Sequence, residues 1–277
     1  MMKLSKAAAF FDRLTCQDAY GTATFKGQFN LFDDATRDGL GSVRRILSVA
    51  PAVSMPVRRV IRTGDKVWLV GESHPDYFGN AEIRRKYTLH QADGLATTQS
   101  FAEILEDSPG TTAYAARVWV KSAKQVDVSS EIFDVFDIYF TSAESVPNQS
   151  VVTLDGLHFL VHESYPTEGG FLAAHASELP VFMSSVTFNS RTYNPLTDAW
   201  ATTLTQVDAL RIRWQDHFRY FTQYSEKYEA GDVQFILLQS TTAAVKAGDT
   251  LVNAGQTYSV VAAYSEGDVW SIHARPA

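Results

Sequence analysis

Two stretches of the chain, "LVGESHPDY" at Leu69–Tyr77 and "LVHESYPTE" at Leu160–Glu168, read almost alike and lie 91 residues apart. With the aromatic residue in front of each, five of eight positions are identical between Trp68–Pro75 and Phe159–Pro166. Self-similarity at a fixed spacing is the signature of a chain built from one structural unit used more than once. We therefore interpret the protein as a tandem repeat.

Other segments extend the repeat in both directions. The segment "AYGTATFKG" at Ala19–Gly27 resembles "AYAARVWVK" at Ala113–Lys121. A third copy begins at "LRIRWQDHF", where Trp214 stands in the place of Trp119, and continues to the end of the chain. Three units of about 92 residues would fill the 277 residues almost completely.

The third copy can be aligned in two ways. Gly64-Asp65 can match Gly248-Asp249, because both are turn dipeptides, or Trp68 can match Tyr258, because both are aromatic residues in an apolar strand. The sequence leaves both alignments open.

Each unit has the pattern of a small β domain. In Phe133–Phe140, Val135, Asp137 and Tyr139 alternate with apolar residues, which indicates a strand with two different faces. Asp155-Gly156 is a strong hairpin signal, because both residue types tolerate positive φ. About five such strands in some 70 residues favour a small barrel or sandwich. The predicted fold is mainly β, with two to three related β-barrel or sandwich units in tandem and a short N-terminal helix.

Two segments indicate helices. The first 18 residues carry an apolar stripe with helical spacing, and Ser100 with Glu103 forms a capping box at the start of Ser100–Asp107. The motifs "ESHP" and "ESYP" are interpreted as turns. The predicted organisation is an N-terminal helix (1–18), a first β unit (19–95), a helical linker (96–112), a second β unit (113–180), a connector (181–204) and a third β unit (205–277).

Composition excludes several classes of protein. The chain is 45% hydrophobic and 20% charged, as globular proteins are. It has no apolar run long enough to span a membrane. Its single cysteine, Cys16, permits no internal disulfide and is expected to be a buried apolar residue. A net charge of −7 without a concentrated basic surface argues against tight binding of nucleic acid.

No constellation of residues points to catalysis. His158 and His162 share a strand face, but four strand residues separate their rings by about 13 Å, which is too far for one metal ion. Ser73-His74 lacks the nucleophile elbow of a hydrolase. We therefore expect no enzyme activity, no catalytic residue, no metal and no cofactor.

Aromatic residues are abundant and suit subunit contacts. "HFRYFTQYSEKYEAGD" is rich in tyrosine and phenylalanine, and the N-terminal segment carries a similar apolar stripe. These residues can equally belong to an ordinary core. The candidate subunit interface consists of Phe10, Phe11, Leu14, Phe218, Tyr220, Tyr224 and Tyr228.

The C-terminal stretch "VKAGDTLVNAGQTYSVVAAY" joins a Gly-Asp turn, two strands and a Gly-x-x-Tyr-x-Val motif. Its residues Val245, Gly248-Asp249, Gly255, Tyr258 and Val260 resemble the small β-barrel connector proteins of tailed bacteriophages, namely head-closure and neck or tail-completion proteins. "IRTGDKVWLVGE" and "VVTLDGLHFLVHE" are weaker echoes. Such connectors are usually a single barrel, so three fused units differ from the family pattern.

The resemblance implies a structural virion protein that is assembled in the host cytoplasm and needs no cofactor. It implies a homo-oligomeric ring on portal, adaptor or tail proteins, through which DNA passes without being held tightly, and no membrane partner. An alternative is a virion binding module that recognises a carbohydrate or receptor, or a capsid-associated minor protein. That alternative would need exposed aromatic residues in a groove, and Trp68, Trp119 and Trp214 are its candidates.

Overall fold

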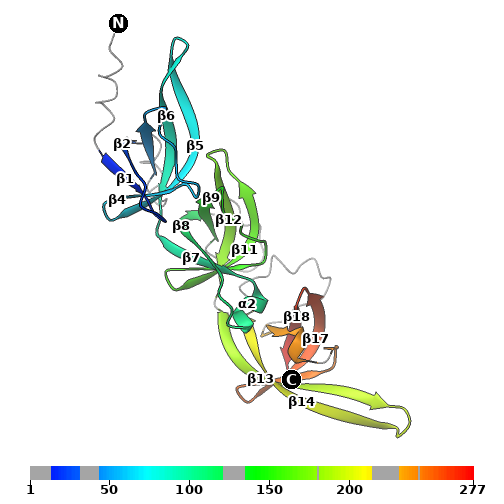
Figure 1. The fold of residues 1–277 in the computed structure, drawn as a ribbon. Coiled ribbons are helices and arrows are strands. Elements are labelled where there is room, and N and C mark those ends of the chain that lie inside the picture. The colour runs from blue at the N-terminus through cyan, green and yellow to red at the C-terminus, as the bar shows by residue number, and fades with distance from the viewer. Residues whose placement is uncertain (1–13, 32–43, 121–134, 180, 214–230, 243) are drawn as a thin grey trace. The chain divides into compact units, whose positions relative to one another are not determined.

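The computed structural model describes residues 14–31, 44–120, 135–179, 181–213, 231–242 and 244–277. These residues form three closed, six-stranded β-barrels in tandem (Figure 1). The predicted fold class is thereby confirmed, with three units.

The three barrels share one topology. In chain order, the strands of each barrel close in the sequence first, second, third, sixth, fifth, fourth, with antiparallel neighbours. The first barrel contains β1 (Leu14–Asp18), β2 (Thr24–Leu31), β3 (Arg44–Val49), β4 (Val60–Thr63), β5 (Lys66–Phe78) and β6 (Ala81–Gln91). The second contains β7 (Gly94–Gln99), β8 (Thr111–Val120), β9 (Val135–Thr141), β10 (Val151–Leu154), β11 (Leu157–Pro166) and β12 (Phe171–Glu178).

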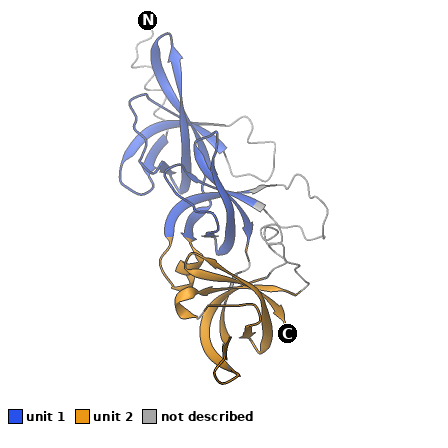
Figure 2. Ribbon diagram, turned by 90° about the vertical axis from the view of Figure 1, so that its right-hand side faces the viewer, with its two compact units in different colours: residues 1–98, 111–178 blue, residues 99–110, 179–277 orange. Residues whose placement is uncertain are grey.

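The third barrel contains β13 (Val181–Asn194), β14 (Ala199–Arg213), β15 (Val233–Leu238), β16 (Thr250–Asn253), β17 (Gln256–Glu266) and β18 (Val269–Pro276). A 3-10 turn, η3 (Gln239–Thr241), follows β15. The chain divides into two compact units (Figure 2). One holds the first two barrels, and the other holds the third barrel together with Gln99–Gly110.

A β-bulge in the fifth strand of each barrel settles the alignment of the repeat. The bulges follow Val70, Val161 and Val260. The residue two positions earlier is Trp68, Phe159 or Tyr258, and each of these rings is buried in the core of its own barrel. Trp68 therefore corresponds to Tyr258.

The alternative alignment of Gly64-Asp65 with Gly248-Asp249 is wrong. Gly64-Asp65 is the turn between β4 and β5, whereas Gly248-Asp249 precedes β16. The true counterparts of Gly64-Asp65 are the turns at Asp155-Gly156 and Ala254-Gly255, whose residues all have positive φ. The hairpin predicted at Asp155-Gly156 is confirmed.

Two predicted helical regions have different outcomes. The capping box is present as expected: the Ser100 amide donates to Glu103 Oε2 at 2.6 Å, and the Glu103 amide donates to Ser100 Oγ at 3.2 Å. It opens α2 (Phe101–Leu105), which packs against β14 and β15. In the N-terminal segment, residues 1–13 lie outside the described part of the chain, and Leu14–Asp18 is a strand instead of a helix. Pairing with β2 and β4 outweighs the local helical pattern there.

Three further expectations are corrected. The second barrel begins at Gly94, so the predicted linker 96–112 contains most of β7 and the start of β8. The predicted connector 181–204 is the first hairpin of the third barrel, formed by β13 and β14. "ESHP" and "ESYP" continue β5 and β11 instead of turning. Pro75 is tolerated in β5 because β4 pairs with β5 only as far as Leu69.

An aromatic cluster joins the first and second barrels. Phe171 of β12 packs with Val60 and Leu69 of the first barrel. His90 of β6 stacks on the Tyr139 ring at 4.8 Å between centroids and meets Phe171 edge-on at 4.7 Å. This apolar contact, dominated by aromatic rings, fixes the two barrels as one unit.

Two glycines allow the backbones of the two barrels to approach closely. The Glu72 amide donates to the Gly169 carbonyl at 2.9 Å. A Cβ at Gly71 would lie 2.1 Å from the Gly169 oxygen, and one at Gly170 would lie 2.0 Å from Glu72 Cγ. The turn between β11 and β12 therefore docks on the bulge of β5 only because both sides lack side chains.

Truncation of Phe171 should test this contact. Because Phe171 is almost fully buried, Phe171→Ala is expected to lower the free energy of unfolding by about 3–5 kcal/mol. Urea denaturation followed by circular dichroism measures this loss. Phe78→Ala is the control, since Phe78 is 81% exposed and should change stability by less than about 0.5 kcal/mol. Similar midpoints for the two variants would contradict the packing described.

The same cluster predicts a pH dependence. Burial, with a smaller contribution from the charge of Arg44, lowers the pKa of His90 to about 3. The unfolded chain binds a proton on this imidazole near pH 6.5 while the folded chain does not, so stability falls as the pH drops through that window. Between pH 7 and pH 5 the unfolding free energy should fall by about 2 kcal/mol from this group. His90→Phe should remove that part of the decline in urea titrations, and an unchanged decline would show that His90 is not its source.

Candidate functional site

Two β-hairpins extend beyond the barrels and offer surfaces for contact (Figure 1). We call residues 73–86 of β5 and β6 the first arm. Residues 190–203 of β13 and β14, which follow the last pairing of β13 with β16, form the second arm. Both are two-stranded over most of their length, and an isolated two-stranded ribbon is only marginally stable in water.

The first arm has an apolar tip on a charged stem. Tyr77 is 62% exposed and Phe78 is 81% exposed. On the stem, Asp76 accepts from Arg84 and pairs with Lys86 at 3.0 Å, while Arg85 Nε donates to Glu82 at 2.6 Å. Hydrogen bonds from Lys86 and Arg84 lower the pKa of Asp76. These exposed pairs contribute little stability but fix which residues face each other across the hairpin.

A cleft of about 390 Å³ lies at the base of the first arm. Arg59 donates from Nη1 to the Gly71 carbonyl at 3.3 Å on one side of it. The lining is mixed, with two arginines among apolar residues, and it defines no reactive group. Its residues are Val53, Ser54, Met55, Pro56, Val57, Arg59, Ser73, Arg85 and Tyr87.

The second arm is regular and almost uncharged. Its strands pair without interruption from Val181–Ile212 to Asn194–Ala199. Met183 and Leu204, which lie on the outer face of this hairpin, are 53% and 67% exposed. At the turn, Tyr193 donates its hydroxyl hydrogen to Asp198 at 2.6 Å.

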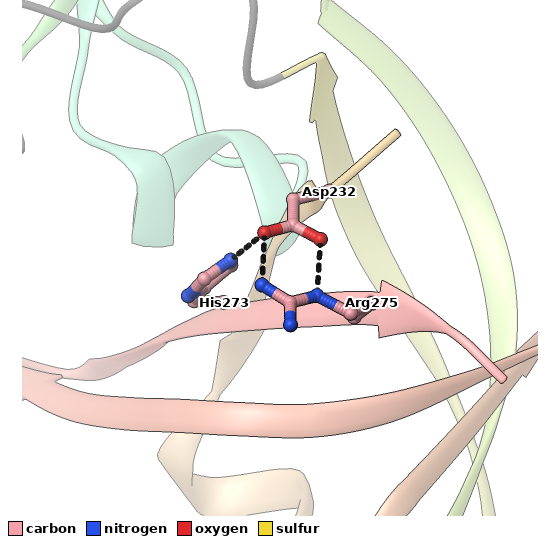
Figure 3. A network of polar contacts seen from close by, with 3 residues as sticks. All are labelled: Asp232, His273 and Arg275. Atoms are coloured by element: carbon pink, nitrogen blue, oxygen red, sulfur yellow. Dashed lines mark hydrogen bonds and ion pairs between the residues drawn. The ribbon is translucent and has the colours of Figure 1, made fainter. Parts of the chain in front are cut away.

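A buried ion-pair network lies at the end of the third barrel (Figure 3). Asp232, whose side chain is fully buried, accepts from Arg275 Nε at 2.9 Å and Nη2 at 3.0 Å. The same carboxylate lies 2.7 Å from His273 Nε2. Because Asp232 immediately precedes β15 and its partners lie on β18, the network clamps the entry of β15 to the neighbouring strand. We interpret it as structural.

A second polar cluster covers the outer face of the second barrel. His175 Nδ1 lies 2.8 Å from Asp137, and Tyr165 donates to the same carboxylate at 3.3 Å. The Asp137 hydrogen bond raises the pKa of His175, and burial beside Asp137 raises the pKa of Tyr165 to about 12. His162 Nε2 lies 2.8 Å from Ser177 Oγ. The cluster cross-links β9, β11 and β12.

The sequence-predicted interface residues are mostly outside these surfaces. Leu14 begins β1 and is 40% exposed. The other six, Phe10, Phe11, Phe218, Tyr220, Tyr224 and Tyr228, lie outside the described residues. Neither arm was predicted from the sequence. The motif "ESHP" in the first arm was interpreted as a turn, and the segment that contains most of the second arm was interpreted as a connector. The sequence feature that could have revealed the arms is the length of the alternating strand pattern, which is greater than the strand length that a six-stranded barrel of this size needs.

His158, Cys16 and Trp68 each occupy a structural position in the described part of the chain. His158 bonds Thr153 at 2.9 Å, and among the described residues no three potential ligands gather around a metal position. Cys16 is fully buried in the first barrel, and burial raises the pKa of its thiol to about 11. Trp68 is a core residue, which removes it from a binding groove. Trp214 lies outside the described residues.

Compared with known proteins, the chain matches no family model, no curated protein and no solved structure. Within the described parts of the chain, no helix is long and apolar enough to cross a membrane.

Removal of the Asp232 charge should destabilise the third barrel. Asp232→Asn leaves the Arg275 guanidinium without its carboxylate, which costs about 3–5 kcal/mol for a buried pair. The expected result is a lower urea midpoint, together with faster hydrogen exchange in β15 and β18. Asp268→Asn, at an exposed position, is the control. Equal midpoints for the two variants would show that the network contributes no stability.

Proposed function

We propose that this protein is a structural virion component of a tailed phage, and that it forms a head–tail connector or neck ring. In this role it binds the preceding ring through one surface and offers another to the next component. The proposal names no catalytic residue and no cofactor.

The pair of arms is the observation that carries the proposal. All three barrels close on themselves, so among the described strands the barrels contribute few free edges. The arms, by contrast, hold large apolar side chains in water, among them Phe78 and Leu196. Rigid domains with protruding apolar hairpins suit a subunit that is completed by its neighbours.

The barrels meet the other requirement of a ring subunit, which is rigidity. Each has a full apolar core, with Phe140 and Phe159 in the second barrel and Phe188 and Phe235 in the third. A net charge of −7 is compatible with a channel past which DNA moves, because such a wall repels phosphate instead of binding it.

The copy number of the protein in virus particles tests this function. Particles should be purified from a phage whose genome encodes this chain, and the protein quantified against the major capsid protein by mass spectrometry. A connector or neck ring at a single vertex predicts about six to twelve copies per particle. Hundreds of copies would indicate a capsid decoration protein instead. Absence from the particle would overturn the proposal.

A further inference from the structure

The cleft at the base of the first arm concentrates positive charge in a chain whose net charge is −7. Its volume of about 390 Å³ lies within the range of pockets that hold small molecules. Among the described residues that line it, the charged groups are the guanidinium groups of Arg59 and Arg85. An anion inside the cleft therefore meets two cations and no carboxylate of the lining.

Both guanidinium groups are held in place by the protein and keep donors for a ligand. Arg59 donates from Nη1 to the Gly71 carbonyl at 3.3 Å. Arg85 donates to Glu82, which is not part of the lining, from Nε at 2.6 Å and from Nη2 at 3.3 Å. A guanidinium group has five N–H donors. Within the described contacts, Arg59 thus keeps the hydrogens on Nε and Nη2, and Arg85 keeps those on Nη1.

The rest of the lining adds an apolar wall and hydroxyl groups. Val53 and Met55 line the cleft and pack against the core of the first barrel, which holds them in position. Hydroxyl-bearing side chains are contributed by Ser54, Ser73 and Tyr87. An apolar wall with a few polar donors is the usual composition of a site for a small organic molecule. The cleft therefore suits a molecule with an anionic end and an apolar body.

Comparison of the three barrels shows that Arg59 departs from the role of its position in the repeat. This position precedes the fourth strand, and Ser150 and Asp249 occupy it in the other barrels. Both are buried and bind their own turn. Ser150 Oγ donates to the Pro147 carbonyl at 2.6 Å. Asp249 accepts from the Lys246 amide at 2.8 Å. Arg59 is instead half-buried and lines the cleft.

Arg59 also has an unfavourable backbone conformation. Its φ is 51°, in the left-handed region, whereas the left-handed residue of this turn in the other barrels lies one position earlier, at Gln149 and Gly248. Glycine adopts this region without the steric cost that a side chain brings. Residues in such conformations gather at functional sites, where the strain is offset by the rest of the structure. The turn alone therefore does not account for an arginine at this position.

We propose that this cleft binds a small organic anion. The carboxylate or phosphate group of the ligand lies between Arg59 and Arg85, because planar guanidinium groups bind such oxyanions through paired N–H donors. The apolar body of the ligand lies against Val53 and Met55. The site lies within one barrel, so it does not depend on the ring assembly of the proposed function.

Ligand-observed fluorine NMR measures binding to the full chain, because the method detects weak ligands and tolerates a large protein. The probes are 4-fluorophenyl phosphate, 4-fluorobenzoate and the neutral 4-fluorobenzyl alcohol. The wild type should bind at least one anionic probe saturably with a Kd of about 1 mM or lower, and about tenfold more tightly than the alcohol. Tighter binding of the phosphate probe assigns the natural ligand to the phosphates, and tighter binding of the benzoate assigns it to the carboxylates.

Arg85→Met tests the pair of guanidinium groups without a change in the strained turn. It should weaken binding of the anionic probes by about tenfold or more and leave binding of the alcohol unchanged. Arg62→Met is the matched control, because Arg62 is an exposed arginine of the same barrel outside the cleft lining. The control should bind all three probes as the wild type does.

Arg59→Gly separates ligand binding from stability. Glycine accepts the φ of 51° without strain, so this variant should keep a urea midpoint equal to or above that of the wild type. It should nevertheless lose binding of the anionic probes, because one of the two guanidinium groups is gone. Circular dichroism during urea denaturation gives the midpoint.

Four results would overturn the inference. The first three are absence of saturable binding of both anionic probes, equal binding of the alcohol, and unchanged binding in Arg85→Met or Arg59→Gly. The fourth is a lower urea midpoint for Arg59→Gly, which would assign the arginine to the stability of the turn. None of these results bears on the number of copies in virus particles, so the proposed function is tested separately.

Discussion

A single hydrogen bond, repeated three times, shapes every barrel of this protein. The amide of one valine, Val70, Val161 or Val260, donates at 2.8–2.9 Å to the carbonyl of the residue that precedes the short fourth strand. The β-bulge follows immediately. Because a bulge bends and twists its strand, the first part of β5 closes the first barrel and its second part leaves the barrel as the first arm. In the first barrel, closure and projection are therefore consequences of one local irregularity, whereas the second arm continues β13 and β14, whose pairing has no bulge.

Local features of the fold could be predicted from the sequence, whereas features set by pairing between distant strands could not. Strands, the hairpin at Asp155-Gly156 and the capping box at Ser100 depend on local residue chemistry and were correctly predicted. "ESHP" was misinterpreted because its glutamate and proline favour turns locally, whereas cross-strand pairing holds it extended. The helix predicted over Leu14–Asp18 was wrong for the same reason, because pairing with β2 holds this segment extended. Free strand edges depend on what does not pair, and a single sequence contains no direct signal for that.

The apolar surface through which the first barrel contacts the second is not repeated in the third barrel. The outward pair Val60–Leu69 of the first barrel, which receives the second, is replaced by Thr250–Ser259 at the same register in the third. The third barrel therefore lacks the apolar pair through which the first barrel contacts the second.

Among the described residues, the arms carry large exposed apolar side chains such as Phe78 and Leu196, and others, such as Val57 and Leu95, lie outside the arms. A partner that binds a hairpin arm orders it at a small cost in conformational entropy, because the register of the arm is already set by its own cross-strand pairs. The closed barrels supply rigidity, and the arms supply exposed apolar surface. The arms follow from strands that are longer than a six-stranded barrel requires.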